Sequence, residues 1–533
     1  MTEPPAEPRG ASIRALLVGL ALAVVIAAYS AYAGLKVGGV YWPIITATLL
    51  AMALLKPLGA ASPQEVNVAA TAASTGGLLA AGVVFTLPAG QLLGVVLSPH
   101  EVSLVATVGG LLGVLFTLPL REEMLERLAL PYPDGAATAQ VIAAGDAGGT
   151  QVRRMLGAFG VGGAFAAVRD GLGWLPPVVA VKGQASGRWL TLGSSVSLVP
   201  LAGGFLIGPR FTGLWFAGAA LSYFGVVPAL VLSGRFAAKG EAIAAITRPA
   251  GIGVIVGASL AYFLVHGLPR LAPLAARLLP RGGRPWQRFG PLAAVAAGIL
   301  ATSVVLQLPL AVALVAVAAG LAVAYMAARI AGELNIDPME IFAIAILLIL
   351  LFFVELPARS AVLLAALLCL AAGMAGDFMQ DLKAGSLVGT RPRDQALAQL
   401  ISVPVSAAVL GVVLAALTQR FQVGSPELPA PQAVALAAIV ARHSIGGPLA
   451  WGGLAGAVAA LLSLRANLGI APIAFGIGVY APLELSLPLF AGGLLRLAAE
   501  RRGSGDHGRL LAAGVLGGEG LVGVVLALWA YWR

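Results

Sequence analysis

Charged residues are scarce in this chain. Only 11% of its 533 residues are Asp, Glu, Lys or Arg, whereas a soluble globular domain carries roughly a quarter. Hydrophobic residues make up 59%, and the mean hydropathy is +0.94. So few charges cannot cover the surface of a water-soluble globule of this size. The composition excludes a soluble protein and predicts an integral membrane protein.

Cysteine and histidine are also rare. The single cysteine, Cys369, lies inside an apolar run, so neither a disulfide framework nor a thiolate metal site is available. The four histidines are far apart and lack ligand spacing such as HxxxH; they are His100, His266, His443 and His507. The sequence therefore predicts no metal site and no cofactor.

Acidic residues number only 23, and they form no dense cluster. A membrane-embedded enzyme or ion pump, such as an ion-translocating pyrophosphatase, needs many carboxylates to hold magnesium around phosphate. A Walker-type phosphate loop is absent as well. We therefore expect a transporter and no enzyme, and keep the pyrophosphatase-like pump as the alternative.

The net charge of +10 has a topological interpretation. Lys and Arg stand between hydrophobic stretches, where the positive-inside rule places them, so the excess does not indicate a nucleic-acid partner. Residues 1–14 are expected to be a cytoplasmic tail. Residues 270–289 contain five arginines and no acid, which predicts a basic cytoplasmic linker.

Long uncharged runs predict an all-α polytopic membrane protein of about 16 transmembrane helices. Trp189–Pro209 is expected to be one such span. Phe289–Ala328 is about twice a membrane thickness, and Leu308–Pro309 should break it into two helices. The short Gly- and Pro-rich pieces Ala136–Gly145 and Gly171–Val181 are expected to be broken or re-entrant segments, which need a protein or cavity lining.

The chain also repeats itself. Pro200–Phe224 precedes a basic link and Arg248–Leu264, as Pro472–Ala498 precedes a basic link and Arg509–Leu528. Farther upstream, Pro131–Val141 is matched with Gln380–Gln395. Internal duplication is typical of secondary transporters. We therefore predict two transmembrane repeats, residues 15–269 and 290–533.

Polar residues are most concentrated between Gly373 and Gln399. On a helix, Asp377 and Asp381 share one face at i and i+4, Gln380 lies beside them, and Lys383 can compensate one carboxylate. The stretch from Gly385 to Pro392 should then break the helix. This pattern suits proton or cation coupling, and it equally suits a charge-balanced loop at the membrane surface.

Two further groups of polar residues have two readings each. Asn67, Thr71 and Ser74 form a stripe on one helical face, which either hydrogen-bonds a neighbouring helix or lines a pathway. Asp337 and Pro338 match the N-cap and the first turn of a helix, so capping explains Asp337. Glu333 and Asn335 lie just before this pair. Glu333 and Asn335 are less easily explained by capping, so we take both as candidate site residues.

Three single acids in apolar surroundings are secondary candidates for protonation, because an acid within the membrane is costly. They are Glu355, Glu484 and Glu519. Glu355 also lies four residues before Arg359, so it can instead mark the membrane interface in an ion pair.

The combined pattern resembles the oligopeptide transporter family, which includes the yellow-stripe-like metal-chelate transporters. The resemblance rests on EVNVAATAASTGGLLAAGVVFTLPA, LPYPDGAATAQVIAAG, GGFLIGPRFTG, AGELNIDPME, MAGDFMQDLKAGSLVGTRPRDQ and GVYAPLELSLP, which occur in the family's order. The segment GDFMQDLKAG with the later PRDQ is the most specific. These motifs lie between about residue 15 and residue 530.

The resemblance implies a carrier of about 16 helices that imports short peptides, or metal complexes of peptide-like chelators, together with protons. It assigns a signature region that comprises Asp377, Gln380, Asp381, Lys383, Arg393 and Gln395. The Asn-Pro-Gly and Lys-Ile-Pro-Pro-Arg motifs of the eukaryotic peptide-transporting branch are absent, so peptide and chelate both stay open as cargo. Short tails and compact loops predict the bacterial cytoplasmic membrane, with lipid as surroundings and the oligomeric state left open.

Overall fold

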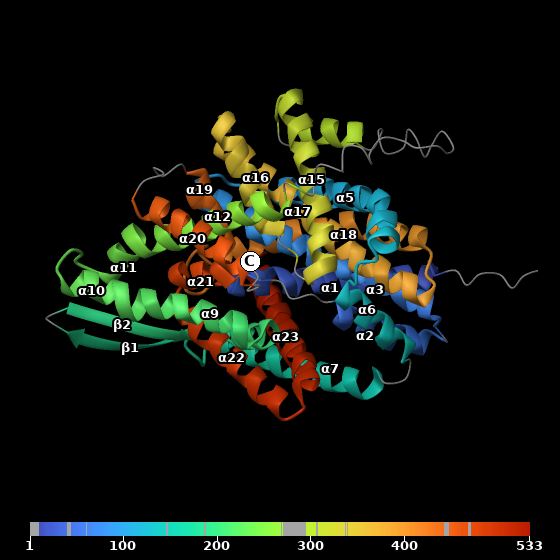
Figure 1. Ribbon diagram of the computed structural model, residues 1–533. Coiled ribbons are helices and arrows are strands. Elements are labelled where there is room, and N and C mark those ends of the chain that lie inside the picture. Colours follow the sequence, from blue (N-terminus) through green and yellow to red (C-terminus); the bar gives the residue numbers. More distant parts are fainter. Residues whose placement is uncertain are drawn as a thin grey trace, which may run out of the picture.

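The computed structural model describes residues 10–39, 44–59, 61–144, 148–185, 188–267, 269, 295–304, 307–335, 337, 339–441, 447–466 and 471–532. Helices dominate this part of the chain (Figure 1). Within it, ten helical segments are long and apolar enough to cross a membrane. The predicted all-α polytopic membrane protein is therefore confirmed, while the number of about 16 spans stays a prediction.

The membrane-length segments are built from the longer helices and their extensions. These are α1 (Ile13–Val37), α3 (Pro63–Thr86) with α4 (Ala89–Leu92), α5 (Pro99–Arg121), α9 (Pro209–Ala220) with α10 (Val227–Leu232), α11 (Lys239–Ala242) with α12 (Arg248–Tyr262), α15 (Leu310–Leu334), α17 (Ala358–Val388), α18 (Pro392–Arg420), α20 (Pro448–Arg465) and α23 (Gly505–Tyr531). Several of them include π-helical turns, such as Glu122–Arg127 after α5. A further π-helical turn, Ala167–Gly171, follows α7 (Gly148–Ala166), which is not one of these segments.

The remaining helices are shorter or more polar. They are α2 (Ile44–Leu55), α6 (Pro133–Ala143), α7 (Gly148–Ala166), α8 (Leu198–Ile207), an unlabelled helix over Val295–Val304, α16 (Met339–Phe353), α19 (Pro431–Val440), α21 (Ala471–Tyr480) and α22 (Leu483–Arg501). The break expected at Leu308–Pro309 is confirmed, because one helix ends at Val304 and α15 begins at Leu310.

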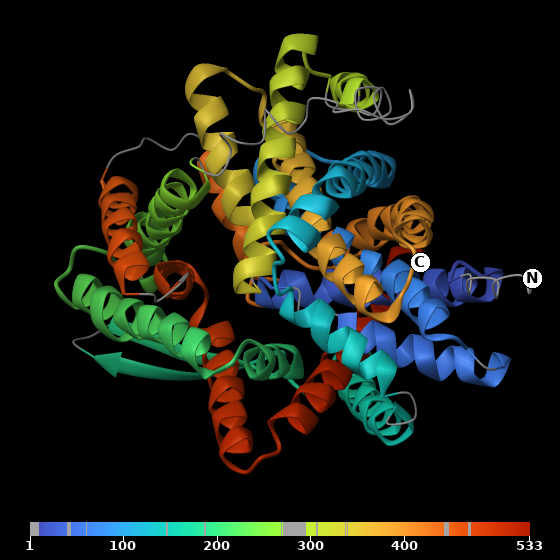
Figure 2. The same cartoon turned by 45° about the vertical axis from the view of Figure 1, so that its right-hand side comes forward.

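One expectation about the spans is wrong. β1 (Val178–Ala185) and β2 (Arg188–Ser195) pair as an antiparallel hairpin, with Val178 opposite Ser195. The hairpin lies at an edge of the molecule beside α10 and packs against α22 (Figure 1, Figure 2). Gly171–Val181 is therefore no half-helix, and Trp189–Pro209 is no span. The apolar residues after the hairpin form only the ten-residue helix α8.

Helices of the first part of the chain pack on helices of the second part in matching pairs of contacts. α8 packs on α22, and in the matching contact α9 packs on α21. The other two matching pairs are α7 on α23 with α12 on α20, and α5 on α17 with α3 on α18. Swapped pairs of this kind are what a duplicated chain forms when its halves are related by a twofold axis. The reciprocity supports the duplication, whose boundaries stay a prediction, and the linker at residues 270–289 lies outside the described residues.

Two short junctions show the same correspondence in their backbone hydrogen bonds. Tyr132, just before α6, donates its N–H to the carbonyl of Gly332 in α15 (3.2 Å), and Ala430, just before α19, donates to Leu35 in α1 (2.8 Å). Both donors have positive φ and stand between two prolines. The counterpart of α6 is therefore α19, and the predicted match of residues 131–141 with 380–395 is wrong.

Glycines allow the paired helices to touch. A Cβ on Gly218 of α9 would lie 2.1 Å from the carbonyl oxygen of Phe475 in α21, and one on Gly478 of α21 would lie 1.8 Å from that of Trp215 in α9. Small residues at helix interfaces are the usual means of close packing in a bilayer. α3 and α17 occupy the middle of this packing, and their most apolar windows are fully buried.

Candidate functional site

The signature segment forms the last turns of α17 and the first turns of α18. Gly389 ends α17 in the left-handed conformation (φ 77°), and Pro392 begins α18. Asp377 and Asp381 lie one turn apart on α17, and each is 2% exposed. The predicted shared face and the helix break are therefore present, but both carboxylates lie in the protein interior and not in a surface loop.

Asp381 is held by hydrogen bonds from two other helices. Its Oδ2 accepts from Ser74 Oγ of α3 (2.9 Å) and from Gln399 Nε2 of α18 (3.3 Å). Gln395 Nε2 donates to the backbone carbonyl of Asp381 (2.6 Å) and to Thr71 Oγ1 (3.2 Å). α3, α17 and α18 are thus fixed to one another by a buried polar network.

The polar stripe of α3 faces this network along its length. Besides Thr71 and Ser74, Asn67 Nδ2 donates to Thr390 Oγ1 between α17 and α18 (3.2 Å). Thr75 Oγ1 donates to Gln399 Oε1 (2.7 Å), so both the oxygen and the nitrogen of that amide are hydrogen-bonded. Of the two readings, the hydrogen bond to a neighbouring helix is observed. Sequence analysis missed Gln399, although it lies one turn after Gln395.

Gln380 joins a second group of elements. Its Oε1 accepts from the N–H of Gly135 in the first turn of α6 (2.9 Å), and its Nε2 donates to Asn335 Oδ1 (3.0 Å). Asn335 ends α15 with φ 57° and also accepts from the N–H of Asp134 (3.3 Å). Orphan N–H groups at a helix start are satisfied here by side chains. The signature helix, the end of α15 and the start of α6 therefore meet at Gln380.

Two carboxylates beside this junction have oxygens without a hydrogen-bond partner among the described residues. They are Oδ2 of Asp377 and both Oδ atoms of Asp337, which precedes α16. Asp337 approaches the α17 backbone so closely that a Cβ on Gly376 would lie 2.5 Å from its Oδ2. Burying an unpaired charge is costly. The site therefore favours a proton or a cationic ligand at these oxygens.

Lys383 does not compensate either carboxylate, contrary to expectation. Its Nζ donates to the backbone carbonyl of Leu130 (3.2 Å) and so anchors the chain ahead of α6. Arg393 is exposed in the first turn of α18, away from the buried network. Glu333 pairs with Arg329 (2.7 Å) at the partly exposed end of α15. These candidates stand at the periphery of the site.

The secondary acids are spread over the molecule. Glu355 is exposed after α16, and Arg359 forms an ion pair with Glu101. Glu484, at the start of α22, lies 3.9 Å from Lys239 Nζ.

Glu519 is fully buried in α23, but the expectation of an isolated acid is wrong. Arg169, from the π-helical turn after α7, donates from Nη1 to Glu519 Oε1 (2.7 Å). Ser197 Oγ donates to the same oxygen (2.6 Å), and the N–H of Leu198 donates to Oε2 (2.8 Å). Because Arg169 lies 350 positions away, sequence spacing gave no signal of the pair.

Metal ligands do not gather in the described part of the chain, where no group of three His, Cys, Asp or Glu side chains could hold a metal ion. Cys369 is a buried free thiol. His100 and His507 are exposed. His443 and the side chain of His266 lie outside the described residues, so the predicted lack of a metal site or cofactor stays a prediction.

Comparison with known proteins identifies the family of this chain. The family model "OPT oligopeptide transporter protein" matches residues 11–266 and 285–530, which is nearly the whole chain. A Haemophilus influenzae protein named "Putative oligopeptide transporter" is 27% identical over 590 residues, covering 93% of this chain and 92% of that protein. The chain therefore belongs to the oligopeptide transporter family, whose members are multi-pass membrane transporters and not enzymes.

Proposed function

We propose that this chain is a proton-coupled symporter of oligopeptides or peptide-like metal chelates of the siderophore type. It works by alternating access in the bacterial cytoplasmic membrane. Family membership and the name of the Haemophilus relative support peptide cargo. The resemblance to yellow-stripe-like proteins supports the chelate. In both cases the protein supplies polar contacts, and the metal travels as part of the cargo.

The observation that carries the proton coupling is the group of buried carboxylates. Among the described residues, Asp377 and Asp337 hold buried oxygens without a donor, while Oδ2 of the neighbouring Asp381 accepts from both Ser74 and Gln399. A carboxyl group in this position changes its charge only by taking up or releasing a proton, and the buried location penalises the charged form. We assign Asp377 as the proton acceptor and Asp381 as the group that orders the network.

Alternating access is supported by where this network lies. Ser74 of α3, in the first part of the chain, donates to Asp381 of α17, in the second. Asn335 and Gln380 extend it to the start of α6. Carriers of this kind move one bundle against another around a central site. Rearrangement of the bonds between α3, α6 and α17 would then link protonation to opening.

The pump alternative has less support. A magnesium pyrophosphate site requires several clustered carboxylates, and the acids near Asp377 do not form a group able to hold a metal ion within the described residues. The family comparison also describes a transporter. The symporter is therefore the function that these observations support best.

Uptake into proteoliposomes under an imposed proton gradient tests the proposal. We expect wild-type protein to accumulate a tripeptide or a ferric chelate from a panel of such compounds, and Asp377→Asn to abolish accumulation while it remains folded in the membrane. Asp506→Asn is the matched control, because Asp506 is almost fully exposed. Wild-type accumulation by Asp377→Asn, with unchanged dependence on the gradient, would remove the coupling role.

A further inference from the structure

Lys36, in the last turn of α1, is a buried cation without a hydrogen-bond acceptor in the described part of the chain. The residue is 9% exposed, and its Nζ lies 5.3 Å from the centroid of the Tyr32 ring. Lysine is almost never buried to this extent unless it is paired. The helix dipole favours a cation at this end of α1, but it does not supply the missing acceptor.

The carboxylates near Lys36 are already engaged. Arg169 forms ion pairs with Glu519 (2.7 Å) and Asp170 (2.5 Å), and donates to the Tyr32 hydroxyl (3.3 Å). Arg420 donates to the Asp170 carbonyl (3.4 Å). Three cations therefore face two bonded carboxylates, which leaves one positive charge.

One further acid acts on Lys36 electrostatically. It is Glu427, on the loop after α18, and its side chain is exposed to solvent. Water screens an exposed charge of this kind strongly. The buried part of the cluster therefore keeps its positive excess.

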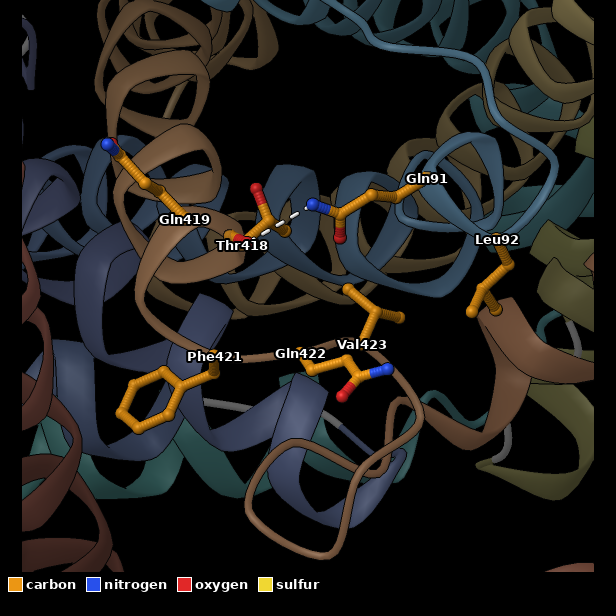
Figure 3. A pocket seen from close by; sticks show the side chains of 7 residues that line it. All are labelled: Gln91, Leu92, Thr418, Gln419, Phe421, Gln422 and Val423. Carbon is orange, nitrogen blue, oxygen red and sulfur yellow. Dashed lines mark hydrogen bonds between the residues drawn. The ribbon is translucent and has the colours of Figure 1, made fainter.

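An open pocket of about 420 Å³ lies between α4 and the end of α18 (Figure 3), and its lining includes Phe421, which follows Arg420 in the chain. Its lining is largely amide and hydroxyl, and Gln91 donates across it to the Thr418 carbonyl (3.1 Å). Phe421, also in the lining, packs edge-on against Tyr32 with ring centroids 6.4 Å apart. Phe421 in the pocket lining therefore contacts the same Tyr32 ring over which Lys36 lies.

This region is the structural counterpart of the candidate site in the other half. Leu35 accepts the backbone hydrogen bond that starts α19, just as Gly332 accepts the one that starts α6. Lys36 is the residue after Leu35 in α1, and Glu333 is the residue after Gly332 in α15, so the two residues occupy equivalent positions. The same junction thus carries a glutamate in one half and a lysine in the other.

We propose that Lys36, supported by Arg420, binds a carboxylate group of the transported peptide-like substrate, which enters through the pocket beside Phe421. A carboxylate would supply both the missing acceptor and the missing negative charge. The glutamine amides of the pocket would contact the peptide backbone. This inference rests on the proposed function, because it names the part of the substrate that the protein recognises.

Binding of trialanine and of trialanine amide, which lacks the terminal carboxylate, tests the assignment. The measurement uses purified full-length protein in nanodiscs of phosphatidylcholine, which carries no carboxylate of its own, and isothermal titration. We expect wild-type protein to bind trialanine at least about tenfold more tightly than the amide, as for a charge-assisted hydrogen bond. Lys36→Gln should bind both equally weakly, and Lys36→Arg should keep the preference.

Lys56→Gln serves as the control, since Lys56 is exposed and its loss should leave the preference unchanged. Gel filtration and the Lys36→Arg variant separate a binding defect from a folding defect. Equal binding of the two peptides by wild type, binding of neither, or a full preference in Lys36→Gln would overturn the assignment. The assay needs no gradient, so binding without accumulation would instead overturn the proposed symport alone.

Discussion

The buried ion pair between Arg169 and Glu519 allows a quantitative test of the packing between α7 and α23. In Glu519→Gln the side chain keeps its size but loses its charge. The amide then presents N–H groups toward donors, because Glu519 accepts from Arg169, Ser197 and the Leu198 N–H. Arg169 would remain in place with a side chain that is 1% exposed.

The expected loss of unfolding free energy in Glu519→Gln follows from the burial of the Arg169–Glu519 pair. Removing one partner of a buried pair costs about 3–5 kcal/mol. Asp170 stays bonded to Arg169 after the substitution, so we expect a value near the lower end, about 3 kcal/mol in the free energy of unfolding. The Arg496–Glu500 pair has the same N–O distance of 2.7 Å, but its glutamate is 39% exposed. Glu500→Gln should cost less than about 1 kcal/mol.

The assay is reversible unfolding of the purified protein in mixed detergent and SDS micelles, followed by tryptophan fluorescence. Wild type, Glu519→Gln and Glu500→Gln are compared under one set of conditions. A third variant, Arg169→Met with Glu519→Leu, removes both charges and should recover part of the loss, because Arg169 no longer stays buried without Glu519. The recovery should be incomplete, because Asp170 also loses its ion pair with Arg169. Equal destabilisation by the two single substitutions would refute the argument from burial.

Three other outcomes are expected. Gly218→Val should reduce the yield of folded protein, because a Cβ there would lie 2.1 Å from a carbonyl oxygen of α21. Gly213→Val in the same helix should be tolerated, because a Cβ there would meet nothing within 4 Å. Equal yields of the two variants in gel filtration would contradict this. Gly385→Ala places a Cβ 2.0 Å from Gln395 Oε1, so uptake should fall while the thermal midpoint changes little, and normal uptake would argue against the network. Asn335→Gly and Asn335→Ala should both lower uptake, but only the alanine should also lower stability, by about 1 kcal/mol, because glycine tolerates the φ of 57°.

Composition and local spacing predicted the features that depend on neighbouring residues. The scarcity of charge indicated the membrane, and Pro309 marked the helix break, because a proline after an apolar run ends a helix. The spacing of Asp377 and Asp381 placed both on one face of α17. The stripe of Asn67, Thr71 and Ser74 was recognisable because polar residues at helical spacing stand out on an apolar helix.

Other features depended on contacts that no local pattern records. A short apolar run has the same appearance in a buried strand and a buried helix. Gly171–Val181 and Trp189–Pro209 therefore suggest helices, whereas the structure forms the hairpin of β1 and β2 there. Lys383 was paired with its neighbours in sequence, but its acceptor is the carbonyl of Leu130. The partner of Glu519 is likewise 350 positions away. Such partners become visible only when the helices are placed in space.

The central position of α3 has a consequence for how the protein is made. Asn67, Ser74 and Thr75 find their partners at Thr390, Asp381 and Gln399, more than 300 residues farther along the chain. Ribosomes add about 5–20 residues per second, so these side chains wait roughly 15–60 s for the second half to be synthesised. During that interval the nascent first half must shelter its polar stripe from lipid by temporary contacts. Folding of the bundle is completed only when the late helices arrive beside the early ones.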